Sequence, residues 1–173
     1  MTRIERLAAK LAEAGVEALV VTKGSDIKYL TGFTGEYGTS VLVVAASGCH
    51  FVTDGRFESQ AAAEVGDAAQ IHVYKRCGMH PATYYTCAGD ILRELGVDEA
   101  GFVAGDITVG DHADLAERAQ GVRLVPVDDF VATIRMIKDA DEIATIRRAC
   151  QISMRSFYAV LDFIKPGVTE IDV

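Results

Sequence analysis

The sequence predicts an α/β fold in which helices cover both faces of a mixed β-sheet. Helical and strand-like segments alternate along the chain as far as Val127, and this order builds layers of helix on sheet. Only one pair of strand-like segments is joined by a link too short to hold a helix, so we expect one antiparallel hairpin within the sheet. With 173 residues, half of them hydrophobic, the chain can form one globular domain and part of a second.

The chain opens with an amphipathic helix. Thr2 and Glu5 have the spacing of a capping box, and Gly15 can end the helix with a left-handed cap. The helix would bury the apolar side chains Ile4, Leu7 and Leu11 on one face. Residues 18–22 then form a short, continuous apolar run, which is typical of a strand buried on both faces.

A helical turn, a loop and the hairpin follow this first strand. Ser25 and Asp26 can cap a single helical turn over residues 27–30. Residues 31–39 contain three glycines without regular periodicity, so we expect a loop there. The predicted hairpin strands are residues 40–45 and 49–53, joined by a tight reversal.

Helix and strand patterns continue to alternate through the rest of the first domain. Glycine follows two of these predicted helices, and Pro81 suits the first turn of the second one. We expect helices over residues 56–65, 81–95 and 111–119, and strands over residues 70–74, 101–104 and 122–127.

A long helix is predicted near the C-terminus. Residues 141–164 contain neither glycine nor proline, and their apolar side chains fall near one face at helical spacing. Such a helix is about 36 Å long at ~1.5 Å per residue, and Pro166 forbids its continuation. Too few residues follow to cover the apolar face, so we expect an under-packed helix that begins a second, truncated domain.

Composition and net charge argue against nucleic-acid-binding and membrane proteins. The net charge of −8 is repelled by phosphate backbones and by anionic membrane surfaces. The apolar runs fall far short of the ~20 residues of a membrane-spanning helix. We therefore expect a cytoplasmic protein that binds neither nucleic acid nor membrane. The four cysteines contain no C-x-x-C pair, which favours free, buried thiols.

Candidate catalytic or ligand-binding motifs are sparse. The glycine-rich segment 32–38 lacks a following Gly-Lys-Ser or Gly-Lys-Thr and leads into a strand, so a surface loop is favoured over a phosphate site. Asp54 and Arg56 are expected to form a helix cap and a structural ion pair, because catalysis would need further partners. The intervals between His72, Cys77 and His80 match no usual metal-ligand spacing.

Four phrases, in this order, nevertheless carry a family resemblance: DIKYLTGFTG at 26–35, TDGRF at 53–57, IRMIK followed by DEI at 134–143, and IKPGVTE at 164–170. Together they resemble the N-terminal half of Xaa-Pro aminopeptidases and Xaa-Pro dipeptidases of the creatinase and prolidase type. The resemblance implies a three-layer α/β/α domain over residues 1–133. Residues 134–173 would be a linker and the first helix of a metallopeptidase catalytic domain with the pita-bread fold.

The resemblance also implies what the full-length protein does. In this family the catalytic domain binds two divalent ions, usually manganese or cobalt, and a metal-bridged hydroxide attacks the peptide bond before proline. The ligands lie beyond the IKPGVTE phrase, so none is expected in this chain, which should hold no cofactor and be inactive alone. The full-length protein would hydrolyse Xaa-Pro peptides as a homodimer or higher homo-oligomer.

In such an assembly, the N-terminal domain of one subunit would reach toward the catalytic mouth of another. Phe33, Glu36 and Tyr37 are the candidates for this substrate-access role, since their loop is irregular and hinged by glycine. The alternative for Phe33 is a place in the local core, and for Tyr37 a plain surface aromatic.

Proteins with two other functions have the same fold. One is a peptidase-like protein-binding module, as in histone chaperones that reuse the fold without catalysis, and the acidic charge would suit basic partners. The other is the N-terminal domain of a creatine-type amidinohydrolase, which acts on a small guanidino compound. The presence of the five metal ligands in the following residues would separate these cases from the peptidase.

Overall fold

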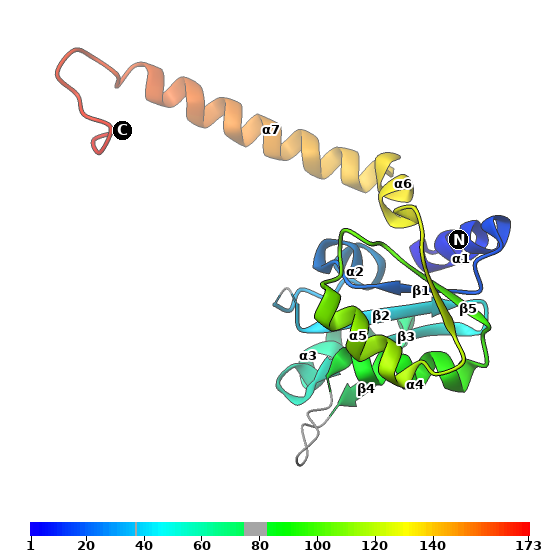
Figure 1. The fold of residues 1–173 in the computed structure, drawn as a ribbon. Coiled ribbons are helices and arrows are strands. Elements are labelled where there is room, and N and C mark those ends of the chain that lie inside the picture. The colour runs from blue at the N-terminus through cyan, green and yellow to red at the C-terminus, as the bar shows by residue number, and fades with distance from the viewer. Residues whose placement is uncertain (37, 75–82) are drawn as a thin grey trace. The chain divides into compact units, whose positions relative to one another are not determined.

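The structure, a computed structural model, describes residues 1–36, 38–74 and 83–173. These residues form two compact units, Met1–Arg135 and Met136–Val173. The first unit contains the β-sheet and the helices that cover it (Figure 1). The domain boundary predicted between residues 133 and 134 falls within a short helix, α6 (Phe130–Met136).

Six strands of the described residues form one mixed sheet in the order β4-β3-β2-β1-β5-β6. The central strand β2 pairs antiparallel with β1 and β3, whereas the β1–β5, β5–β6 and β3–β4 pairs are parallel. All strands except β2 therefore run in one direction and end at the same edge of the sheet. The strands are β1 (Ala18–Val21), β2 (Ser40–Ala45), β3 (Gly48–Asp54), β4 (Gln70–Tyr74), β5 (Glu99–Phe102) and β6 (Arg123–Pro126).

Helices cover both faces of this sheet, which confirms the predicted fold class (Figure 1). One apolar core lies between the sheet and α1, α2, α3 and α6, and a second lies between the sheet and α4 and α5. Every residue of β1 and β2 is buried, because alternate side chains enter opposite cores. The covering helices are α1 (Arg3–Ala14), α2 (Gly24–Thr31), α3 (Glu58–Glu64), α4 (Tyr84–Leu95) and α5 (Val109–Arg118).

The first helix and the hairpin confirm the local sequence signals. The Thr2 hydroxyl accepts a hydrogen bond from the Glu5 amide at 3.1 Å, and the Glu5 carboxylate accepts one from the Thr2 amide at 2.7 Å. Gly15 takes a left-handed conformation with φ of 70° after α1. In the hairpin, β2 and β3 pair along their full length from Ser40 opposite Thr53 to Ala45 opposite Gly48.

The prediction around Ser25 and Asp26 was wrong. Helix α2 begins at Gly24 rather than after Asp26, and Lys23 is its N-cap without a side-chain hydrogen bond. Asp26 is buried within the helix instead of capping it, because its carboxylate pairs with Arg135. Helix α6, which carries Arg135, was not predicted at all, since its seven residues give too short a periodic pattern.

Two other helix boundaries differ from the sequence prediction. A 3₁₀ turn, Gly55–Phe57, precedes α3, so the regular helix begins only at Glu58. Helix α4 begins at Tyr84, where Thr83 forms a capping box with Thr86. Pro81, the predicted start of this helix, lies outside the described residues.

The second unit is dominated by one long helix, α7 (Ala140–Leu161). Asp139 and Glu142 form a capping box at its start, and none of its residues is buried. The helix ends at Leu161, before the predicted stop at Pro166. Among the described residues, no helix has the length and apolar character needed to cross a lipid bilayer.

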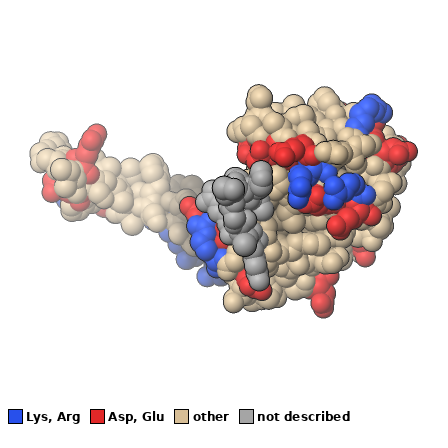
Figure 2. Space-filling model, turned by 60° about the horizontal axis from the view of Figure 1, so that its bottom comes forward, with Lys and Arg blue, Asp and Glu red and all other residues tan. Residues whose placement is uncertain are grey.

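Charged side chains of both signs share the surface. On the face drawn in Figure 2, Lys and Arg side chains lie directly beside Asp and Glu side chains. A nucleic acid backbone is attracted to continuous basic surfaces. This mixed face, like the net charge of −8, does not favour nucleic acid as a partner.

Candidate functional site

The edge where β1, β3, β4, β5 and β6 end is here named the carboxyl edge. Ligands of open α/β sheets usually bind beyond the carboxyl ends of the strands, so this edge is the first place to look for a site. The loop between α2 and β2 lies at the same edge, because it enters the antiparallel strand β2 there. Phe33 and Glu36 of this loop therefore lie at the carboxyl edge, as do Asp54 and Arg56 at the end of β3.

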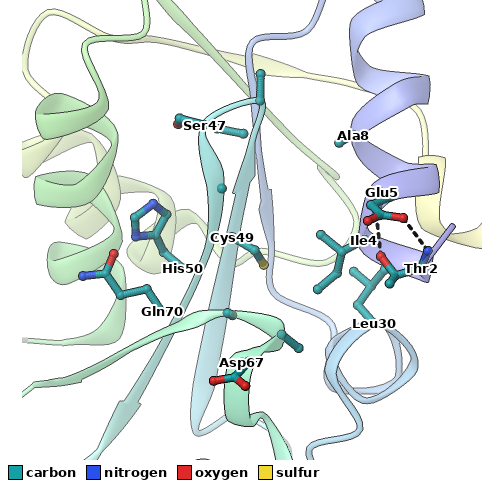
Figure 3. A pocket seen from close by; sticks show the side chains of 15 residues that line it. Thr2, Ile4, Glu5, Ala8, Leu30, Ser47, Cys49, His50, Asp67 and Gln70 are labelled. Carbon is teal, nitrogen blue, oxygen red and sulfur yellow. Dashed lines mark hydrogen bonds between the residues drawn. The ribbon is translucent and has the colours of Figure 1, made fainter.

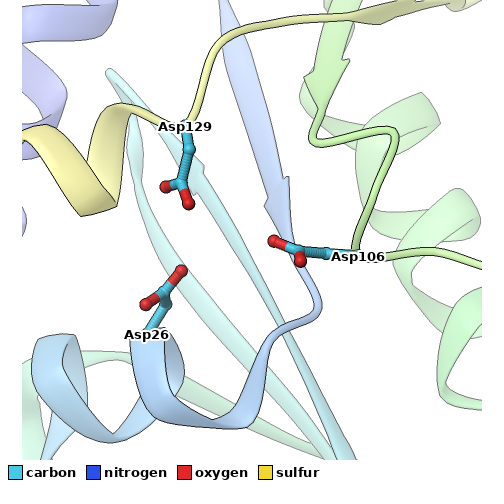
Figure 4. Close-up of side chains that lie close together, drawn as sticks. All are labelled: Asp26, Asp106 and Asp129. Carbon is cyan, nitrogen blue, oxygen red and sulfur yellow. The ribbon is translucent and has the colours of Figure 1, made fainter.

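Three aspartates converge at the carboxyl edge, as Figure 4 shows. Asp26 is on α2 after β1, Asp106 follows β5, and Asp129 follows β6. Each offers a carboxylate oxygen, and these oxygens lie within 4.8 Å of one another. We name these three residues the aspartate cluster.

Two cations form ion pairs with the three carboxylates of the aspartate cluster. Arg135 Nη1 donates to Asp26 Oδ1 at 2.5 Å. Lys23 Nζ lies 3.8 Å from a carboxylate oxygen of Asp106 and 3.6 Å from one of Asp129. Burial raises the pKa of Asp26, and the nearby charge of Asp129 raises it further, while the hydrogen bond from Arg135 opposes the shift.

These ion pairs decide what the cluster does. The carboxylates have the spacing of cation ligands, but each of them already pairs with Lys23 or Arg135. The ion pair between Asp26 and Arg135 ties α6 to α2, across 109 positions of sequence. We therefore assign the aspartate cluster to holding the end of the first unit in place.

Sequence reasoning missed the aspartate cluster. The sequence pattern predicts a helix cap at Asp26 and indicates no role for Asp106 or Asp129. The available signal was positional, since each aspartate follows closely after a predicted strand. Without the sheet order, nothing indicated that those three strand ends are adjacent.

Phe33 lies in the core rather than at the surface. Its side chain is 3% exposed, and its ring packs edge-on against Phe51 and Phe57 with centroids 4.8 and 6.0 Å apart. The ring therefore has the place in the local core that was the alternative for Phe33, and its access role stays a prediction. Gly35 follows closely, and a Cβ there would lie 2.2 Å from the Phe33 ring.

A hydrogen-bond clamp holds the loop that follows Phe33. The Glu64 carboxylate accepts from the Thr34 amide at 2.6 Å and from the Thr34 hydroxyl at 2.7 Å. Gln60 donates to both partners at 3.1 Å. These bonds lower the pKa of Glu64, the backbone bond from Thr34 contributing most. The clamp fixes this end of the loop on α3.

The rest of the loop is anchored through its backbone. The Thr39 hydroxyl donates to the Glu36 carbonyl at 2.6 Å, and the buried Thr53 hydroxyl donates to the Thr39 carbonyl at 3.0 Å. The Glu36 side chain is exposed at the carboxyl edge. Tyr37, the third predicted access residue, lies outside the described residues.

Asp54 and Arg56 contact each other at the end of β3. Arg56 Nε and Nη2 donate to the two carboxylate oxygens of Asp54, with the shortest contact at 2.6 Å. Asp54 also accepts from the Arg56 amide at 2.8 Å and so caps the 3₁₀ turn before α3. The side-chain hydrogen bond from Arg56 lowers the pKa of Asp54. Neither residue lies within the aspartate cluster.

The sequence analysis compared the spacing of His72, Cys77 and His80 with that of metal ligands. Only His72 is among the described residues. Its ring lies beside His50 on the neighbouring strand, with His50 Nδ1 and His72 Nε2 3.0 Å apart. Sequence reasoning did not consider His50, because its proximity depends on the register of β3 and β4.

A pocket of about 610 Å³ opens at the opposite end of the sheet, next to the hairpin turn (Figure 3). Ile4, Leu30 and Cys49 form part of its apolar lining. Glu5 is engaged in the capping box with Thr2, and burial raises the pKa of the Cys49 thiol to about 12. A thiol in that state is a poor nucleophile, so Cys49 is not an activated catalytic group.

Comparison with known families decides which domain this fold is. The creatinase/prolidase N-terminal domain family matches residues 3–137, nearly the whole of the first unit. The chain belongs to this family. The first unit of this chain thus has the fold that the four sequence phrases implied.

Proteins related in sequence to this creatinase/prolidase N-terminal domain carry the names of peptidases. The chain is 31% identical over 173 residues to a probable dipeptidase, PepE, of Mycobacterium tuberculosis, covering 99% of this chain and 45% of that protein. It is 29% identical over 171 residues to the uncharacterized peptidase YqhT of Bacillus subtilis, covering 99% of this chain and 46% of that protein. The chain thus spans about half the length of the curated relatives it matches.

Solved structures of peptidases have the same fold as this chain. A Xaa-Pro dipeptidase from Bacillus anthracis superimposes with a TM-score of 0.85 at 28% identity, over 98% of this chain and 45% of that one. The N-terminal domain of the cytoplasmic peptidase PepQ from Mycobacterium tuberculosis superimposes with a TM-score of 0.65 at 25% identity, over 76% of this chain and 96% of that one. The creatinase/prolidase N-terminal domain accounts for the first unit, and the longer match also includes α7.

Proposed function

We propose that this chain is the non-catalytic N-terminal domain of a cytoplasmic Xaa-Pro dipeptidase or aminopeptidase, which helps to assemble subunits and to restrict access to the active site. The observation that carries the proposal is the superposition of nearly the whole chain on less than half of a Xaa-Pro dipeptidase. The peptidase names of its relatives favour this function over a binding module or an amidinohydrolase.

The chemistry of hydrolysis belongs, in this proposal, to the catalytic domain. That domain would hold two divalent ions, manganese or cobalt, which activate the attacking water. The aspartate cluster does not fit such a centre, because its carboxylates are already engaged in ion pairs with Lys23 and Arg135. We therefore assign no step of peptide hydrolysis to the described residues of this chain.

The loop at the carboxyl edge is the part of the domain suited to substrate access. The Thr34–Glu64 clamp and the buried Phe33 ring fix its first half, while the Glu36 side chain stays exposed. A fixed backbone with a projecting carboxylate can meet the free amino end of a peptide without reorganising. In a homodimer or higher homo-oligomer, this loop would face the active-site mouth of a neighbouring subunit.

Activity measurements on two proteins test the main proposal. The chain alone and the chain joined to its catalytic domain are each incubated with a Xaa-Pro dipeptide and Mn²⁺. We expect turnover that a chelator abolishes in the longer protein, and no turnover in the chain alone. Chelator-sensitive turnover by the purified chain, or a longer protein inactive on every Xaa-Pro peptide, would refute the proposal.

The access role has its own test in the longer protein. Glu36→Gln and Tyr37→Ala should change KM or the preference for peptide length, while metal content and fold stay intact. Arg123→Gln, at the far edge strand β6, is the matched surface control. If both loop variants keep wild-type kinetics on substrates of several lengths, the loop has no part in access, and the domain serves assembly alone.

A further inference from the structure

Two histidines lie side by side on the two parallel strands at one end of the sheet. His50 is on β3 and His72 is on β4, and the register places His50 opposite Gln70, two residues before His72. The three side chains therefore share one face of the sheet. In Figure 3, the His50 ring and the Cys49 side chain point to opposite sides of β3, and both residues line the pocket beside the hairpin turn.

The distance between one nitrogen of each ring matches the distance between two nitrogen ligands of a single metal ion. His50 Nδ1 and His72 Nε2 are 3.0 Å apart, and the ring centroids are 5.2 Å apart. Zinc–nitrogen bonds of about 2.0–2.1 Å place two cis nitrogens roughly 2.9 Å apart at a right angle and about 3.4 Å apart in a tetrahedron. Both nitrogens can therefore ligate one ion with only a small shift of either ring.

Both rings are accessible from solvent. The side chains of His50 and His72 are only partly buried, so an ion can reach their nitrogens. A neutral imidazole is the commonest protein ligand of transition-metal ions. In the absence of an ion, the hydrogen bond between the two rings holds them in place.

We propose that His50 and His72 together form a binding site for a divalent transition-metal ion such as Zn²⁺. Imidazole ligands suit zinc, copper and nickel, whereas manganese and magnesium prefer oxygen ligands. The site is therefore distinct in chemistry from the dinuclear centre proposed for the catalytic domain. An ion here would cross-link the edge strand β4 to β3.

The first test is a titration of the whole chain with ZnCl₂, followed by the imidazole resonances in NMR. We expect the His50 and His72 signals to shift and saturate at one equivalent of Zn²⁺, while the His112 signals stay in place. His112 packs against Phe102 on another part of the sheet, so it is an internal control. This readout separates the site from zinc bound by cysteine thiols. Unchanged His50 and His72 signals overturn the proposal.

Variants supply the second test. His50→Gln and His72→Gln should each weaken Zn²⁺ binding by at least about tenfold and remove the zinc-dependent rise in the unfolding temperature. His112→Gln should retain both. If all variants bind Zn²⁺ with the same affinity as the unaltered chain, the histidine pair is only a structural hydrogen bond.

Discussion

Removal of Arg135 should destabilise the first unit far more than removal of its partner Asp26. In Arg135→Ala, the Asp26 carboxylate stays 2% exposed and faces Asp129, and of its two nearby cations only Lys23 remains. In Asp26→Asn, the guanidinium left behind is already 38% exposed and can be hydrated. Removal of Arg135 is therefore expected to lower stability more than removal of Asp26, although the two side chains form one ion pair.

The burial of each partner sets the size of the effect. Breaking a fully buried pair by deleting one partner costs about 3–5 kcal/mol, and an exposed pair contributes about 1 kcal/mol or less. Arg135 is over a third exposed and Lys23 stays in place, so we expect about 2–3 kcal/mol for Arg135→Ala. For Asp26→Asn we expect about 1 kcal/mol. The larger loss corresponds to a fall of roughly 4 to 12 °C in the unfolding temperature.

Urea unfolding followed by near-ultraviolet circular dichroism is the suitable assay, because five of the six tyrosines lie in the first unit. The double variant completes a thermodynamic cycle and isolates the coupling between the two side chains. Arg56→Ala is the matched control, since its guanidinium pairs with Asp54 at an exposed position. Equal losses for Arg135→Ala and Asp26→Asn would refute the reasoning.

The same pair has a predicted pH dependence. The pKa of Asp26 is raised above its ordinary value of 3.8, so folding favours its protonated form. Its contribution to stability is therefore complete below that value and is lost as pH rises through the raised pKa. The deficit of Arg135→Ala relative to the unaltered chain should grow from about pH 4 to pH 7. A deficit that is constant over this range would contradict the assignment.

Three further predictions follow from close packing and burial. Gly35→Ala places a Cβ 2.2 Å from the Phe33 ring and should cost about 1–3 kcal/mol in thermal unfolding. Gly89→Ala places a Cβ 2.6 Å from a backbone carbonyl oxygen of α5, so it should force α4 and α5 apart at about 1–3 kcal/mol. The exposed thiol of Cys150 should react with iodoacetamide at neutral pH, whereas Cys49, with its pKa raised to about 12, should react only after unfolding.

Controls for these predictions are available in the same chain. An added Cβ at Gly105 meets open space, so Gly105→Ala should leave the unfolding temperature nearly unchanged. Equal stability of all three alanine variants would show that the close contacts are absent in solution. Peptide mapping by mass spectrometry locates the alkylated cysteines, and rapid labelling of Cys49 in the folded chain would contradict its burial.

Local sequence signals predicted most of the fold. The capping box of Thr2 and Glu5, the two-sided burial of β1 and the tight hairpin are each encoded within a few residues, and the structure contains all three. The four phrases also identified the family. Those features could be found because the residues that form each one are close together in the chain.

The candidate sites could not be predicted in the same way. Asp26 looks like a helix cap in sequence, and only the fold reveals Arg135, 109 positions away, as its partner. His50 and His72 are 22 positions apart, and their contact depends on strand register rather than on a motif. For Phe33 the sequence left both an access role and a place in the local core open, and only the fold shows that the Phe51 and Phe57 rings provide an apolar site that buries it.

The strand order has a consequence for synthesis on the ribosome. Strands β1 to β4 are consecutive in the chain and adjacent in the sheet, so they can pair once Tyr74 has emerged. The other side of β1 must wait for β5, since Ala18 pairs with Ala100. Until then the nascent chain displays an open strand edge made entirely of apolar residues, a template for pairing with other chains. A chaperone that protects this protein during translation therefore has a defined target, and a defined interval in which to bind it.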